Sequence, residues 1–99
     1  MWQVKHPISY YQQFKNYMFV AKPLTIKQPN ASKLLREMRA QLGLTQEQLA
    51  LHLGVTYSTT NRWENERGTP SPLAIAKIEA MLLQMGDRGR ELLKKYTSN

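Results

Sequence analysis

The chain has no cysteine, few histidines and few acidic residues. Without cysteine it can form neither disulfide bonds nor Cys-based zinc sites, which is usual for proteins of a reducing compartment. Its two histidines, His6 and His52, stand far apart in the sequence, and neither a glycine-rich phosphate loop nor a recognisable arrangement around a nucleophile is present. We therefore expect no enzymatic activity, no cofactor and no metal site.

Long apolar runs are also missing. The longest, residues 17–21, is far too short to cross a bilayer, and Lys15 and Asn16 stand before it. We expect neither a membrane span nor a signal peptide, and hence a cytoplasmic protein. Positive charge, by contrast, is in excess, because 14 Lys and Arg stand against seven Asp and Glu, a net charge of +7. Such a balance favours a polyanionic partner: DNA, RNA or an anionic membrane surface.

The most informative stretch is residues 45–65, which has the pattern of two short helices joined by a tight turn. Thr45 is a good N-cap, and Gln48, three residues later, completes a capping box. Apolar residues then recur at helical spacing as far as Gly54. Glycine readily adopts the left-handed conformation that ends a helix, so the turn is expected there.

A second helix begins directly after this turn. Thr56 offers another N-cap, and Trp63 is the one large apolar anchor of a helix over about residues 57–66. Apolar stripes at helical spacing predict further helices before and after this pair. These further helices are expected from Asn30 or Ser32 to Leu42, from Pro72 to Met85 and from Arg88 to Tyr96. The expected fold is all-α, a compact bundle of about five helices.

Six residues in residues 45–65 stand at a characteristic spacing: Gln46, Ala50, Gly54, Val55, Trp63 and Glu64. This set resembles the helix-turn-helix of the phage-repressor, or Xre (Cro-like), family of DNA-binding regulators, and the resemblance extends over about residues 30–83. It implies a lambda-repressor-like domain, double-stranded DNA as a partner, and a role as a small transcriptional regulator such as a repressor. It also implies an ion pair between Arg39 and Glu64.

Two residues depart from the family pattern. Thr60 stands where Val or Ile is usual. Thr is nearly the shape of Val and can return its hydroxyl to the carbonyl four residues back, and we expect a small loss of stability there. Glu66 stands where a glycine commonly ends the recognition helix, so we expect this helix to end later, toward Gly68.

The outward face of the second helix supplies the candidate base contacts. They are Tyr57, Ser58, Thr59, Asn61 and Arg62, and the resemblance favours Tyr57, Ser58 and Arg62. An α-helix fits the major groove of B-DNA, and a guanidinium can bridge guanine O6 and N7, so Arg62 is the first choice. Its alternatives are a phosphate contact or a solvated side chain.

Candidate phosphate contacts surround this helix. Thr45, Gln46 and Thr56 lie at helix N-termini, where unpaired N–H groups and the helix dipole attract anions. Lys33, Arg36 and Arg67 are further candidates by charge. Since one recognition helix buries little surface, we expect a homodimer bound to two half-sites about 34 Å apart on a palindromic site.

We divide the chain into an N-terminal extension (residues 1–29), a helix-turn-helix DNA-binding domain (30–86) and a short C-terminal helix with a tail (87–99). In the last helix, Leu92, Leu93 and Tyr96 are candidates for exposed apolar residues. This helix either pairs two subunits or folds back on its own core, and the sequence leaves both open.

The extension is basic and aromatic, with four Lys and no acidic residue. Its aromatic residues recur at helical spacing and predict an amphipathic helix from Ser9 to Val20. These side chains either pack on the domain or a second copy, or form an arm that touches phosphates or a minor groove, or belong to a disordered segment. An alternative function is that of an antitoxin-type module, which binds a partner protein through residues 1–29 and autoregulates its operon.

Overall fold

A computed structural model describes residues 24–97 of the chain. Its five helices are α2 (Asn30–Leu42), α3 (Gln46–Leu53), α4 (Tyr57–Glu64), α5 (Pro72–Gln84) and α6 (Asp87–Thr97). The expected all-α fold of about five helices is therefore confirmed. The helix predicted over residues 9–20 lies outside the described residues.

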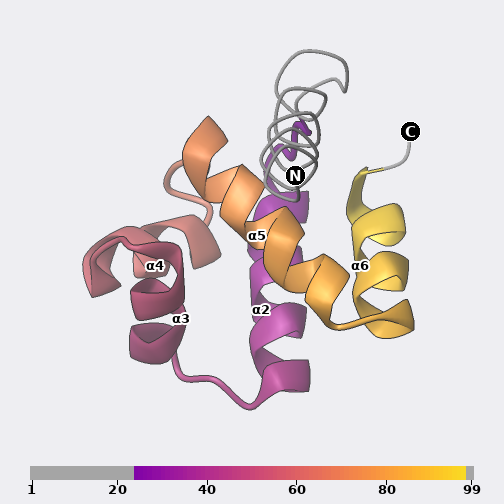
Figure 1. The fold of residues 1–99 in the computed structure, drawn as a ribbon. Helices are drawn as coiled ribbons and strands as arrows, with labels where there is room; N and C mark the ends of the chain where they lie inside the picture. The colour runs from indigo at the N-terminus through magenta and orange to yellow at the C-terminus, as the bar shows by residue number, and fades with distance from the viewer. Residues whose placement is uncertain (1–23, 98–99) are drawn as a thin grey trace, which may run out of the picture.

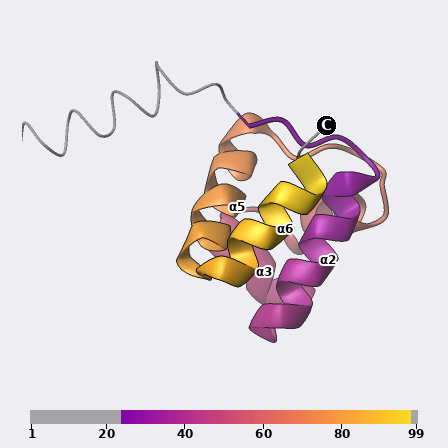
Figure 2. The same ribbon diagram turned by 90° about the vertical axis from the view of Figure 1, so that its right-hand side faces the viewer.

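Helix α2 lies at the centre of the domain, with α3 and α4 on one side and α6 on the other (Figure 1). Helix α5 crosses in front of α2 in this view and contacts both α3 and α6. A view from the side shows α6 lying along α2 (Figure 2). Helix α4 makes its main contacts with α2 and α3.

The helix boundaries follow local signals in the sequence. Thr45 and Gln48 form the predicted capping box, in which the Thr45 hydroxyl accepts the Gln48 N–H at 3.0 Å and the Gln48 side chain accepts the Thr45 N–H at 2.9 Å. Gly54 has a φ of 70° and ends α3 in the left-handed conformation. The Ser71 hydroxyl caps α5 by accepting the Ala74 N–H, with Pro72 in the first turn.

The core is apolar, and every helix except α4 contributes several residues to it. From α4 only Trp63 enters the apolar cluster. The largest fully buried apolar side chains are Leu34, Leu35, Met38, Leu49, Leu53, Ile78 and Leu82. Burying such a side chain contributes about 1.5–3 kcal/mol each, so this cluster provides the main driving force for folding.

Helix α6 folds back on the core of its own chain. Leu92 and Tyr96 are 4% and 8% exposed, and Leu93 packs against the cluster, so the prediction that these residues are exposed is wrong. The helix lies close to α5 because its third residue is Gly89. A Cβ at this position would lie 1.6 Å from the Leu82 carbonyl oxygen, closer than any side chain allows.

Part of the segment before α2 also belongs to the folded unit. Ile26 is 2% exposed and is a member of the core cluster, and Leu24 packs against the cluster. The Gln28 side chain donates to the carbonyls of Trp63, in the last turn of α4, and of Gly68, which follows this helix. Residues 24–28, which the sequence reading assigned to the extension, thus lie against the helical domain.

Candidate nucleic-acid interface

The two ends of α4 differ in exposure. Tyr57 is 51% exposed and Ser58 is exposed, whereas Thr60, Trp63 and Glu64 are buried. The N-terminal turn of this helix therefore faces solvent and its C-terminal turn faces α2. Thr59 is half-buried, because it lies at the edge between the two faces.

Thr45 and Thr56 are exposed N-cap residues of α3 and α4. The Thr56 hydroxyl oxygen accepts the Thr59 N–H at 3.1 Å and lies 2.9 Å from the Thr59 hydroxyl. Such capped N-termini still carry partial positive charge and further backbone N–H groups, the features that bind phosphate.

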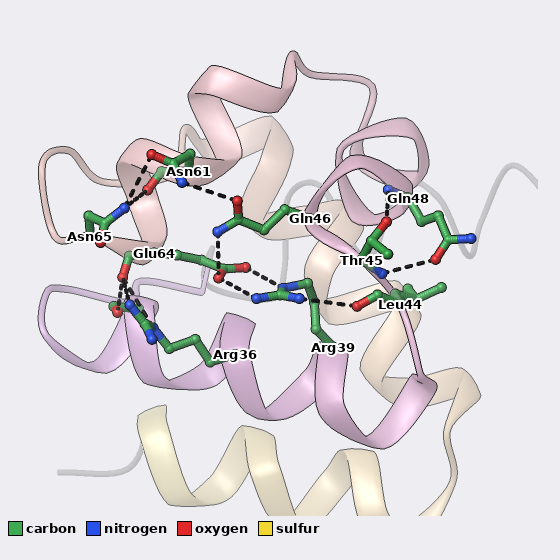
Figure 3. A network of polar contacts seen from close by, with 10 residues as sticks. Arg36, Arg39, Leu44, Thr45, Gln46, Gln48, Asn61, Glu64 and Asn65 are labelled. Carbon is green, nitrogen blue, oxygen red and sulfur yellow. Dashed lines mark hydrogen bonds and ion pairs between the residues drawn. The ribbon is translucent and has the colours of Figure 1, made fainter.

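Gln46 and Asn61 lie between α3 and α4 (Figure 3). The Asn61 side-chain amide donates to Gln46 Oε1 at 3.1 Å, and Gln46 Nε2 donates to Glu64 Oε1 at 2.9 Å. Asn65 adds hydrogen bonds from its side-chain amide to the Asn61 carbonyl and side chain. Both predicted DNA-contact residues are thus half-buried members of one polar chain that joins the two helices.

This chain ends at the ion pair of Arg39 with Glu64 (Figure 3). The guanidinium donates from Nε at 2.7 Å and from Nη2 at 2.8 Å to the two carboxylate oxygens, and from Nη1 to the Leu44 carbonyl at 3.1 Å. Glu64 is 1% exposed. The hydrogen bonds to the Glu64 carboxylate raise the pKa of Arg39 above its ordinary value, so the guanidinium stays charged. The pair that the resemblance implies is present.

Three side chains donate to the last carbonyl groups of α4. The Ser32 hydroxyl donates to the Glu64 carbonyl at 2.7 Å, and Arg36 donates to the same oxygen from Nε at 3.2 Å and Nη2 at 2.9 Å. Gln28 Nε2 donates to the Trp63 carbonyl at 2.9 Å. These bonds satisfy acceptors that a helix C-terminus leaves unpaired. Arg36, a predicted phosphate contact, is engaged here.

The sequence reading missed Gln28 and Ser32 as partners of α4. Their acceptors follow them by 35 and 32 residues. Neither residue belongs to a local cap of α4, so no short-range signal marked them.

The end of α4 differs from the prediction. The helix ends at Glu64, not near residue 66 or Gly68. Glu66 itself has a φ of 60°, the left-handed value that a glycine would take. The N–H of Arg67 donates to the Arg62 carbonyl at 2.8 Å and that of Glu66 to the Trp63 carbonyl at 3.2 Å, the bond pattern of a Schellman motif. The motif forms here without glycine because its hydrogen bonds and those from α2 hold the turn.

Thr60 is fully buried, and its hydroxyl oxygen has no hydrogen-bond partner, so it does not return to the carbonyl four residues back. A buried hydroxyl without a partner destabilises the folded state. The residue fits by its Val-like shape alone.

The remaining basic candidates are Arg62, Arg67 and Lys33, and all three are exposed. Arg62 Nη2 donates to the Arg67 carbonyl at 3.1 Å, so the guanidinium lies against the turn that follows α4. Within residues 24–97, no helix could span a membrane and no group of three or more His, Cys, Asp or Glu side chains could hold a metal ion.

Two short helices joined by a tight turn, the second with an exposed N-terminal turn and a buried C-terminal one, define a helix-turn-helix protein. A family model described as Helix-turn-helix matches residues 35–82. The chain belongs to the Xre-type (Cro-like) family of helix-turn-helix DNA-binding transcriptional regulators, which are not enzymes.

Two curated relatives are similar to this chain. Both are 45% identical to it over 49 residues. One is the uncharacterized HTH-type transcriptional regulator RghRB of Bacillus subtilis, with 48% of this chain and 35% of the relative covered. The other is an uncharacterized HTH-type transcriptional regulator of Methanothermobacter thermautotrophicus, with 50% and 71% covered. This chain thus aligns with about a third of the Bacillus protein. No solved structure shows a significant match.

Proposed function

We propose that this protein binds double-stranded DNA sequence-specifically as a homodimer and regulates transcription, with α4 in the major groove of each half-site. The observation that carries the proposal is the exposed N-terminal turn of α4, with Tyr57 and Ser58, on a helix whose C-terminal turn is anchored. Residues near the N-terminus of such a helix contact base edges, while the preceding helix abuts the backbone.

Each candidate side chain then has a role. Tyr57, Ser58 and Arg62 contact bases, and Thr59 and Asn61 support them from the edge of the same face. Phosphate oxygens bind at the N-termini of α3 and α4, at Thr45, Gln46 and Thr56, and at the exposed side chains of Lys33 and Arg67. Arg36 serves mainly to hold α4, since its Nε and Nη2 both donate to the Glu64 carbonyl.

The first test is a selection of random duplexes with the purified protein at physiological salt, about 0.15 M. Enrichment of a palindrome with half-sites about one helical turn apart is the expected result. Binding without an enriched sequence, falling steeply with salt, would instead show that phosphate contacts alone hold the DNA.

Arg62→Ala tests the main base contact. The variant should lose about 1–3 kcal/mol of discrimination at one base pair per half-site. A uniform loss of affinity over all sequences would assign Arg62 to phosphate. Sedimentation of the protein on the selected duplex tests the dimer, and one protein per complete palindrome would refute it.

A further inference from the structure

One side chain from the segment before α2 bridges two parts of the chain that are distant in sequence. Gln28 Oε1 accepts the Ser32 N–H at 2.9 Å, and its Nε2 donates to the carbonyls of Trp63 at 2.9 Å and Gly68 at 2.7 Å. Pro29 precedes α2 and provides no side-chain cap, so the Gln28 oxygen takes that role. The amide orientation follows from these partners, since a flipped amide would face two carbonyl oxygens with its own oxygen.

The turn to which Gln28 donates, residues 66–68, also contacts the side chain of Arg62. The Arg62 guanidinium donates to the Arg67 carbonyl at 3.1 Å. It also lies against Gly68, because a Cβ built there would be 3.0 Å from Arg62 Nη2 and 3.5 Å from its Cζ. Gln28 and Arg62 thus contact the same short turn, the first through the Gly68 carbonyl and the second through the Arg67 carbonyl.

We propose that Gln28 is a positioning residue for Arg62: its amide fixes the turn over residues 66–68, and the fixed turn orders the guanidinium before DNA is bound. Ordering a long side chain in advance lowers the entropic cost of its contact and raises specificity. The inference rests on the proposed function, in which Arg62 contacts a base. Gln28 itself lies outside residues 35–82, the part of the chain that matches the family model, whereas the turn and Arg62 lie within it.

The first experiment needs no DNA. Nitrogen-15 relaxation of the Arg62 Nε–H group reports how restricted the side chain is, and we expect Gln28→Met to increase its motion because the three hydrogen bonds are lost. Gln28→Glu keeps an oxygen for the Ser32 N–H but removes both donors, so it should mobilise Arg62 as well. Gln84→Met, the same substitution at an exposed position at the end of α5, is the matched control and should change nothing.

Gly68→Ala acts on the same guanidinium from the other side. The φ of Gly68 is not in the left-handed region, so alanine fits the backbone, but its Cβ displaces Arg62 Nη2. We expect the Arg62–Arg67 bond to be lost while the Gln28 bonds remain. If Gln28→Met does not fold, Gln28→Glu provides the decision, because it keeps the bond from the Ser32 N–H and removes only the donors to Trp63 and Gly68.

The second experiment uses the duplex selected by the wild-type protein. At the base pair that Arg62→Ala identifies, Gln28→Met and Gly68→Ala should lower discrimination by about two- to tenfold, the cost of ordering one long side chain on binding. Affinity for unrelated DNA should stay within about twofold, because phosphate contacts are unchanged. A purely structural role of Gln28 would lower stability and leave this ratio as it is.

The outcomes separate the two claims. Unchanged Arg62 motion in the Gln28 variants overturns the positioning role, whatever Gly68→Ala and the DNA results show. A wild-type protein that selects no sequence overturns the proposed function, while the relaxation data still decide whether Gln28 orders Arg62.

Discussion

The two sides of helix α2 hold their neighbours by different means. Toward α4, the contacts of α2 and the segment before it are mainly hydrogen bonds and a buried ion pair, from Gln28, Ser32, Arg36 and Arg39. Toward α6, the contact is mainly apolar, with Leu92 and Tyr96 in the core cluster. Its polar contacts are partly buried or exposed, and they join Glu37 to Tyr96 and Lys95 and Asn30 to the Tyr96 carbonyl.

The difference separates stability from orientation. Apolar burial stabilises without a preferred direction, whereas hydrogen bonds to defined carbonyl groups fix a helix in both rotation and position. Helix α4, which reads DNA in our proposal, is held by the directional side of α2, the side with the hydrogen bonds and the buried ion pair. Helix α6, which closes the core, is held by the apolar side of α2.

The largest effect is expected from breaking the directional side. Arg39→Met leaves the Glu64 carboxylate buried without its charged partner and should lower the free energy of unfolding by about 3–5 kcal/mol. Urea denaturation followed by far-ultraviolet circular dichroism measures it. The double variant Arg39→Met with Glu64→Leu should recover most of the loss, because no buried charge remains; a loss as large as in the single variant would mean that the pair itself stabilises the fold.

Removing an apolar side chain from the contact between α2 and α6 should give a loss of similar size but of different origin. Leu92→Ala should cost about 2–5 kcal/mol, because it removes buried apolar atoms and leaves a cavity. At a temperature where the variant is folded, its preferred DNA sequence should equal that of the wild type. A changed sequence preference would show that α6 also orients α4.

A gain in stability is expected at Thr60 of α4, whose buried hydroxyl has no hydrogen-bond partner. Thr60→Val keeps the shape and removes the hydroxyl without a partner, so it should raise the free energy of unfolding by about 1–3 kcal/mol. Thr60→Ala serves as the control, since it removes the hydroxyl and also a buried methyl group. If Val is no more stable than Thr, the hydroxyl has a partner in solution.

The smallest effect concerns the polar edge of the apolar side. The Tyr96 hydroxyl donates to the Glu37 carboxylate, and this bond, with Lys95 nearby, holds the pKa of Glu37 below its ordinary value of 4.5. A carboxyl group whose pKa is lower in the folded than in the unfolded state stabilises the folded state at pH values above the unfolded-state pKa. This stabilisation is lost as the pH falls through the folded-state pKa. The difference in the free energy of unfolding between the wild type and Glu37→Gln should therefore be constant near neutral pH and shrink below about pH 4.5. A difference that persists in acid would show that ionisation of the Glu37 carboxylate is not its cause.

The elements that the sequence predicted correctly depend on neighbours in the chain. The capping box at Thr45, the left-handed Gly54 and the caps Thr56 and Ser71 each need residues within three or four positions. The helical spacing of apolar residues then predicted the all-α fold. The Arg39–Glu64 pair was predicted by resemblance, since no local rule joins these residues.

The errors arose where distant parts of the chain meet. Whether α6 is exposed depends on its fit to α2 and α5, which Gly89 permits by the close approach of its backbone to Leu82. Glu66 takes a left-handed conformation, and α4 ends early, because of hydrogen bonds within the turn and from α2.

The sequence by itself therefore determined the helices, the turn between α3 and α4, and the family to which they belong, because caps and apolar spacing act over a single turn of helix. Only the tertiary structure decided how α4 is held and where the Arg62 side chain rests. Those depend on Gln28, Ser32 and Gly68, residues whose partners the folded chain alone brings within hydrogen-bonding or van der Waals distance.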